Sequence, residues 1–336
     1  MTRHRSEAVV NDGEEPSKLR AGVIGVGAMG ANHARIYSEC RDIDLVGVVD
    51  LDHELAMDVA KQYGTTAVQL ADLVESCDLV SVAVPTFAHA DTVRTCLEAE
   101  IHVLVEKPLT ESLEEGRALC RQANEANALL QVGHVERFNP AVDTAAAIIE
   151  DLEVIAIDAQ RLGPPVDRPD LDGVVLDLMI HDIDVIGSLL GSNPTKIAAQ
   201  GTGDGQYATA TMHYDDVIAS VTASRRTQKK VRTLTITTSE CLIEVDYLEQ
   251  SVLIHRDSYP EYVTDDGTNR YRHESVIERP RVHNGEPLKR EIRSFIDAIR
   301  TGSEPAVTAT DGLEALETVT EIERLIDDGG QEVIVR

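Results

Sequence analysis

The first part of the chain alternates short apolar runs with longer segments that carry a polar face. The apolar runs are rich in β-branched residues and short, as is typical of buried parallel strands, and the segments between them have helical lengths. The runs occupy residues 19–26, 44–50, 65–68, 78–85, 101–105 and 128–133. Strands that alternate with helices imply right-handed βαβ units. Residues 18–135 are therefore predicted to form a doubly wound parallel sheet of six strands.

From residue 136 onward, apolar and polar positions alternate with a period of two. A helix is predicted over 174–190, and alternating strands are predicted at 154–161, 207–214, 217–224, 233–238, 241–245 and 251–255. The polar stretch 259–284 predicts a loop or irregular hairpin. Helices at 288–300 and 313–326 and a last strand at 332–335 complete the chain. This alternation favours an α+β domain over 136–336, built on a largely antiparallel open sheet.

The stretch 18–30 reads KLRAGVIGVGAMG and joins the first strand to a helix-permissive segment. In a strand–turn–helix unit, Gly25, Gly27 and Gly30 permit a tight turn, close approach of a pyrophosphate and close helix packing. The helix start at Ala28 and Met29 offers free N–H groups to phosphates. Asp50 ends the second strand, twenty residues after Gly30, at the spacing of a ribose-binding carboxylate. We therefore predict an α/β chain with an N-terminal Rossmann domain that binds NAD, with NADP less favoured.

Composition adds a strong acidic balance. The 336 residues carry a net charge of −28, with 24 Arg and only 7 Lys, a balance that resembles halophilic proteins. Such a charge argues against nonspecific nucleic-acid binding. Residues 1–17 lack the apolar core of a signal peptide and are predicted to be a disordered tail, and no apolar run approaches the length of a membrane helix. Five scattered cysteines indicate reduced thiols, so a cytoplasmic protein without a zinc site is expected.

A lysine follows the fifth apolar run directly. Lys107 stands at the carboxyl end of this predicted strand, and the proline after it fixes the backbone. A surface lysine in a turn is the alternative, which the scarcity of lysine weakens. Ligands collect at the carboxyl edge of open α/β sheets. The predicted cofactor contacts at this edge are Pro85, Thr86, His89, Glu106 and Lys107.

A second group of chemically active residues lies in the predicted helix 174–190. Asp177 and His181 are four residues apart, so on a helix they share a face and can form a hydrogen bond. A carboxylate that is hydrogen-bonded to an imidazole makes the imidazole a stronger base. A structural histidine, a solvated acidic face and a metal site at Asp177, His181 and Asp184 remain alternatives.

Taken together, these motifs resemble the Gfo/Idh/MocA oxidoreductase family, from about Leu19 to the C-terminus. They read GVIGVGAMG, VAVPT, EKPL at 106–109 and D-x-x-x-H-D at 177–182. The resemblance implies a Rossmann domain, and a sheet domain whose open face often makes oligomer contacts, as in a homodimer or homotetramer. It also implies metal-free hydride transfer between a sugar-like alcohol and NAD(P), with Lys107, Asp177 and His181 as the catalytic residues.

Two further stretches resemble a narrower group within this family. GHVERFNP at 133–140, with RLGPP at 161–165, is similar to members that oxidise the 3-hydroxyl of UDP-N-acetylglucosamine-type sugars. The implied contacts for the sugar or its diphosphate are Asn139, Arg161 and Arg168. A dehydrogenase of a free sugar or inositol is the main alternative. A non-catalytic NAD-binding regulator is a third, although such a protein would not need all three catalytic residues.

Overall fold

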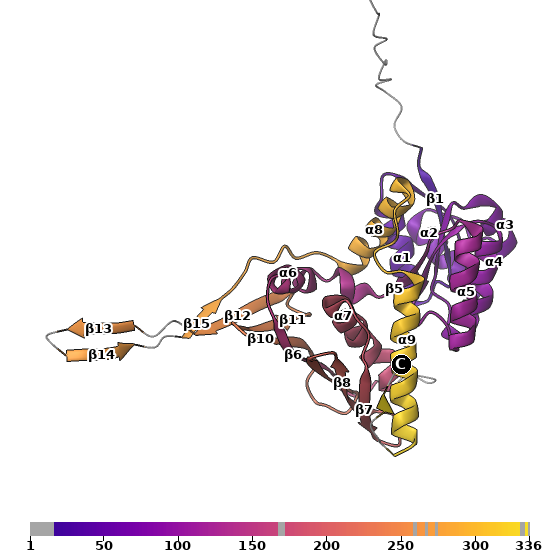
Figure 1. The fold of residues 1–336 in the computed structure, drawn as a ribbon. Helices are drawn as coiled ribbons and strands as arrows, with labels where there is room; N and C mark the ends of the chain where they lie inside the picture. Colours follow the sequence, from indigo (N-terminus) through magenta and orange to yellow (C-terminus); the bar gives the residue numbers. More distant parts are fainter. Residues whose placement is uncertain are drawn as a thin grey trace, which may run out of the picture.

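The computed structural model describes residues 17–166, 172–257, 261–265, 268–272, 275–329 and 333–334. Residues 1–16 of the predicted tail and Arg168 lie outside the described residues. Two sheets organise the chain: a parallel sheet flanked by helices and a larger sheet beside it (Figure 1).

The N-terminal part is a five-stranded parallel sheet in the order β2-β1-β3-β4-β5. Its strands are β1 (Leu19–Ile24), β2 (Ile43–Val49), β3 (Leu79–Val82), β4 (His102–Glu106) and β5 (Leu130–Gly133). Its helices are α1 (Ala28–Glu39), α2 (His53–Tyr63), α3 (Leu70–Ser76), α4 (His89–Glu98) and α5 (Leu113–Ala126). The order changes direction between β1 and β3, which creates a ligand-binding crevice at the carboxyl edge. The predicted Rossmann architecture is confirmed.

The prediction of a strand at 65–68, the third of six in chain order, was wrong. This segment forms only an isolated bridge, Val48 to Ala67, with backbone hydrogen bonds of 2.9 and 3.0 Å on either side. Gly64 ends α2 in the left-handed region (φ 71°), and Gln69 already caps α3. The four residues between these helix ends therefore meet β2 at a single bridge.

The C-terminal part is a nine-stranded, mostly antiparallel sheet in the order β15-β12-β11-β10-β6-β9-β8-β7-β16. Only β6 and β9 pair in parallel among these strands. The strands are β6 (Val154–Leu162), β7 (Lys196–Gly201), β8 (Tyr207–Tyr214), β9 (Val217–Ser224), β10 (Val231–Thr238), β11 (Leu242–Asp246), β12 (Ser251–Asp257), β15 (Ser275–Glu278) and β16 (Val333–Ile334). Burial alternates along β8 and β9, as the sequence pattern predicts.

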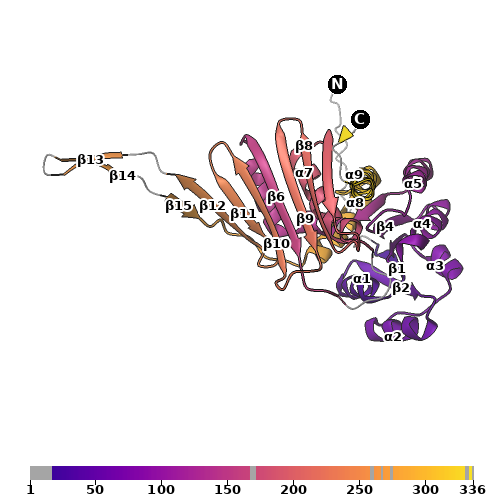
Figure 2. The same ribbon diagram turned by 90° about the horizontal axis from the view of Figure 1, so that it is seen from below.

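Helices cover one face of this sheet. These are α6 (Pro140–Ile149), α7 (Ile180–Leu190) and α9 (Ala309–Asp327), and no helix of the described residues covers the other face (Figure 2). The polar stretch 259–284 contains the hairpin of β13 (Glu261–Asp265) and β14 (Thr268–Arg272), which projects away from the body (Figure 1). The open, largely antiparallel sheet is therefore confirmed.

The last two long helices join the two parts of the chain. Leu288, Ile292, Phe295 and Ile296 of α8 (Pro287–Thr301) are buried in one core with β1 and α1. Helix α9 packs against α5 and β5 on one side and against α7 and β7 on the other. The division of the chain into 18–135 and 136–336 stays a prediction, and the structure adds that the C-terminal helices bridge it. This packing holds α7 in place beside the parallel sheet. Within the described residues, no helix has both the length and the apolar character needed to span a membrane.

Candidate active site

The glycine loop leaves open space at the start of α1. A Cβ on Gly30 would lie 1.8 Å from the Gly25 carbonyl oxygen, and one on Gly25 would lie 2.7 Å from the Ala83 backbone. A Cβ on Gly27 would meet nothing within 4 Å. Helix α1 begins at exposed Ala28 and Met29 without a side-chain cap. The tight packing below and the free space above fit a pyrophosphate at the helix start.

Asp50 stands beside this loop at the carboxyl end of β2. Its carboxylate accepts hydrogen bonds from the Val26 N–H (2.7 Å) and the Asp52 N–H (2.9 Å). These two bonds fix the carboxylate next to the glycine loop, where a ribose-binding acid is required. The residues at this edge therefore fit a nicotinamide dinucleotide.

Lys107 follows β4 and reaches across to the segment before α7. Its Nζ donates to the Asp177 backbone carbonyl (2.7 Å) and to Asp177 Oδ1 (2.9 Å). Arg225, which directly follows β9 and is buried, donates to Asp177 Oδ2 and to the Asp172 carbonyl (2.7 Å). Burial by itself would raise the pKa of Asp177, but Lys107 and Arg225 together hold that pKa below its ordinary value. Asp177 is therefore a carboxylate shared by two cations.

The expected hydrogen bond between Asp177 and His181 is absent from the described residues. Residues Val175–Met179 form a π-helical turn ahead of α7, so positions four apart no longer lie one above the other. His181 forms no hydrogen bond there, and only its Nδ1 is fully buried. Its Nε2 is therefore the ring nitrogen that is not fully buried. Asp177 orients Lys107 and not the imidazole.

His181 is held in its neutral form. Burial, followed by the nearby charges of Lys107 and Arg161, lowers the pKa of His181 well below 6.5. An imidazole that is neutral at neutral pH can accept a proton from an alcohol without first losing one. The site thus combines an unprotonated base with an adjacent ammonium group.

Asp177→Asn is expected to lower both stability and turnover, because it leaves Lys107 and the buried Arg225 without a counter-charge. The expected cost is about 3 kcal/mol of unfolding free energy and about tenfold in kcat. Denaturant unfolding and steady-state kinetics measure the two effects. Asp143→Asn, which breaks the surface pair with Arg290, is the matched control and should change little. Equal effects of the two substitutions would contradict the assigned role.

Three further buried histidines, His33, His89 and His134, lie near the site. His89, expected at the cofactor, is buried, and its ring nitrogens contact the Pro108 carbonyl (2.8 Å) and the Val84 carbonyl (2.9 Å). It holds the turn after Lys107, and its contact with the cofactor stays a prediction. His33 of α1 binds Glu106 Oε1 (2.9 Å) and Ser81 Oγ (2.8 Å), and buried His134 lies 3.8 Å from Asp184. Neither His33 nor His134 was predicted to be a site residue.

Pro85 and Thr86 stay at the carboxyl edge of β3, and Glu106 ends β4 beside them. Pro85 is exposed and Thr86 is half-buried. Their positions agree with the edge on which the cofactor contacts are predicted.

Asn139 and Arg161, the two described residues predicted to contact substrate, are both bonded within the fold. Asn139 is buried, caps α6 through the Ala141 N–H and donates to the Tyr247 carbonyl (3.1 Å). Arg161 is buried, forms two bonds to Asp182 (2.8 and 2.9 Å) and one to Glu136 (2.9 Å), and lies over the Tyr247 ring. Arg161 thus joins β6 to α7 and to the segment after β5, and Asn139 joins the start of α6 to Tyr247. Contact of either side chain with substrate stays a prediction.

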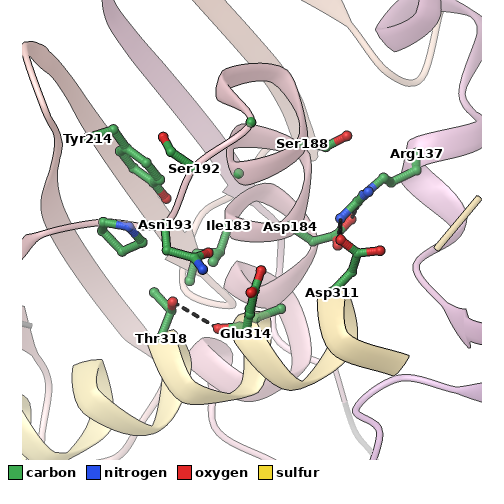
Figure 3. A pocket seen from close by; sticks show the side chains of 14 residues that line it. Arg137, Ile183, Asp184, Ser188, Ser192, Asn193, Tyr214, Asp311, Glu314 and Thr318 are labelled. Carbon is green, nitrogen blue, oxygen red and sulfur yellow. Dashed lines mark hydrogen bonds and ion pairs between the residues drawn. The ribbon is translucent and has the colours of Figure 1, made fainter. Parts of the chain in front are cut away.

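A cavity of about 340 Å³ lies between α7 and α9 (Figure 3). Arg137 bounds it, with ion pairs to Asp184 (2.8 Å) and Asp311 (3.5 Å). Lys107, Asp177 and His181 are not among its lining residues, so this cavity is separate from the candidate site. Asp184 is thus turned toward Arg137, and no group of metal-ligating side chains occurs in the described residues. The alternative of a metal site at Asp177, His181 and Asp184 does not fit.

Known proteins share both parts of this architecture. Residues 19–134 match the model of the oxidoreductase family with an NAD-binding Rossmann fold, and residues 157–244 match the GFO/IDH/MocA C-terminal domain. UDP-N-acetylglucosamine 3-dehydrogenase of Acidithiobacillus ferrooxidans is 33% identical over 84% of this chain and 88% of its own. Inositol 2-dehydrogenase of Rhizobium meliloti is 30% identical over 89% and 94%.

A solved structure extends the likeness to three dimensions. The structure of the Acidithiobacillus ferrooxidans UDP-N-acetylglucosamine 3-dehydrogenase matches with a TM-score of 0.83 at 28% identity, and covers 93% of this chain and 98% of its own. The two family models match the two parts of one fold, which also contains the glycine loop and the Lys107–Asp177 pair. The chain belongs to the GFO/IDH/MocA family of oxidoreductases.

Proposed function

We propose that this enzyme oxidises a ring hydroxyl of a sugar with NAD, and that its substrate is a UDP-N-acetylhexosamine oxidised at the 3-hydroxyl. The observation that carries the proposal is the meeting of Lys107, Asp177 and His181 at the carboxyl edge of the parallel sheet. The similarity to a UDP-N-acetylglucosamine 3-dehydrogenase supports the substrate class.

The side chains of His181 and Lys107 have different roles in the proposed chemistry. His181 Nε2 takes the hydroxyl proton, and the Lys107 ammonium stabilises the alkoxide that develops on the oxygen. Asp177 holds Lys107 through two hydrogen bonds, so the ammonium is oriented before the substrate arrives. Such preorganised charge commonly contributes a few kcal/mol to transition-state stabilisation. Bound NAD supplies the hydride acceptor, held by the glycine loop and Asp50.

Asp50 is expected to make the enzyme select NAD. A fixed carboxylate accepts hydrogen bonds from the ribose hydroxyls and repels a 2′-phosphate, so NAD should bind at least about tenfold more tightly than NADP. Asp50→Ser should remove most of this preference. Calorimetric titration with both dinucleotides measures it. Asp58→Ser, at an exposed acid of α2, is the control, and tighter binding of NADP by the wild type would defeat the assignment.

Steady-state kinetics with a panel of alcohols tests the proposed substrate class. We expect a kcat/KM for UDP-N-acetylglucosamine far above those for N-acetylglucosamine, glucose and myo-inositol. The free-sugar alternative is favoured by the inositol 2-dehydrogenase relative, and it predicts the reverse order.

We further propose that copies of the chain associate as a homodimer or homotetramer through the helix-free face of the C-terminal sheet, in the cytoplasm of a halophilic cell.

A further inference from the structure

The turn between β9 and β10 differs in charge from the rest of this acidic chain. Residues 225–232 read RRTQKKVR and hold five of the 31 basic residues. No acidic residue occurs between Asp216 and Glu240, although the chain has 59. We call residues 225–232 the basic turn. Two of the seven lysines, Lys229 and Lys230, lie in it and are exposed.

The basic turn is anchored directly beside the candidate active site. At its start, Arg225 donates to Asp177, the carboxylate that holds Lys107. In its middle, the Thr227 N–H donates to the Gly163 carbonyl (3.0 Å). At its end, Arg232 donates to the Leu162 carbonyl (2.6 Å). These contacts hold the turn against the carboxyl end of β6, next to the catalytic cluster.

Among the described residues, Arg232 differs from its neighbours because it forms no ion pair. Arg161 is paired with Asp182, Arg225 with Asp177 and Arg226 with Asp204. Arg232 forms no ion pair with a carboxylate in the part of the chain that the structure describes, and its two hydrogen bonds, both from one guanidinium nitrogen, go to backbone carbonyls.

This unpaired cation is also half-buried, which is unfavourable without a nearby anion. Burial, followed by the charge of Arg161, lowers the pKa of Arg232. Asp182, Glu136 and Asp177 partly offset this shift, and a bound anion would add to their effect. None of the described carboxylates forms an ion pair with Arg232, although the chain has a large excess of acids.

We infer that Lys229, Lys230 and Arg232 bind the diphosphate of the substrate. This inference rests on the proposed function, because it assumes a nucleotide sugar. In such a sugar, C1, which carries the diphosphate, is separated from C3 by one ring carbon. The partners of the diphosphate must therefore lie beside the catalytic cluster and not within it, as the basic turn does. The planar guanidinium of Arg232 can give two parallel hydrogen bonds to phosphate oxygens. The exposed Lys229 and Lys230 add positive charge in the same turn.

The test compares Arg232→Gln and the double variant Lys229→Gln/Lys230→Gln with the control Lys61→Gln/Lys196→Gln. The control removes two exposed lysines of α2 and β7, far along the chain from the turn. Calorimetry measures the Kd of UDP and of inorganic pyrophosphate, and kinetics separates KM from kcat on UDP-N-acetylglucosamine. Arg232→Gln should weaken both ligands at least about tenfold and raise KM with kcat nearly kept. The double lysine variant should weaken them about two- to fivefold, and the control should not.

The outcomes separate this inference from the function on which it rests. Unchanged Kd values in both turn variants, with a wild type that oxidises the nucleotide sugar, would overturn the inference alone. A wild type that binds UDP but oxidises only free sugars would overturn the proposed function, while weakened UDP binding in the variants would still support the subsite. A wild type that binds neither UDP nor pyrophosphate would overturn the subsite.

Discussion

Lys107→Met is expected to lower kcat by about 10²–10³-fold while the Kd of NAD stays nearly unchanged. The substitution removes the ammonium that stabilises the alkoxide, and loss of one such donor typically costs this much. Asp177 keeps its bond to the buried Arg225, so the segment before α7 should stay in place. Steady-state kinetics with the nucleotide sugar and titration with NAD measure the two quantities.

Lys196→Met is the matched control, because Lys196 is an exposed lysine at the start of β7. It should behave as the wild type. Thermal melts establish that both variants are folded. A folded Lys107→Met protein with wild-type kcat would show that Lys107 does not act on the substrate.

His181→Ala is expected to lower kcat by about 10²–10⁴-fold, the usual contribution of a general base. It should also change the pH profile. The lowered pKa of His181 keeps the wild-type base unprotonated through neutral pH, so kcat/KM should fall only as pH drops well below 6.5. The variant has no base to protonate, so its residual rate should lack this acid limb.

His255→Ala is the control, since His255 is a partly exposed histidine of β12 that pairs with Glu244. It should keep both the rate and the acid limb. If the limb survives in a folded His181→Ala protein, another group produces it and His181 is not the base.

Strand positions were predictable because a two-residue period reports directly which side of a sheet is buried. The alternation over 207–214 became β8, with Ala208, Ala210 and Met212 inside. The glycine loop and Asp50 were predictable for a similar reason, since both depend on local spacing. The single bridge at 65–68, in place of a strand, was not predictable, because the two flanking helix ends set the length of this segment.

Side-chain partners were harder to predict than the elements that carry them. A π-helical turn has no sequence signal here, and it redirected Asp177 from His181 to Lys107. His89 and Arg161 were placed in the correct segments, but tertiary packing turned both inward. Arg225 comes from a distant strand end, and the only sequence sign of it was the acid-free stretch around it. Contacts between segments far apart in the chain decided each of these cases.

Transfer of deuterium from C3 of the nucleotide sugar to the cofactor would identify the proposed reaction. The enzyme is incubated with NAD and UDP-N-acetylglucosamine that carries deuterium only at C3, and the products are identified by NMR and mass spectrometry. We expect equal amounts of a 3-oxo nucleotide sugar and of reduced cofactor that contains the deuterium. Reduced cofactor without deuterium, or none from this substrate while a free sugar or inositol is oxidised, would contradict the proposed reaction.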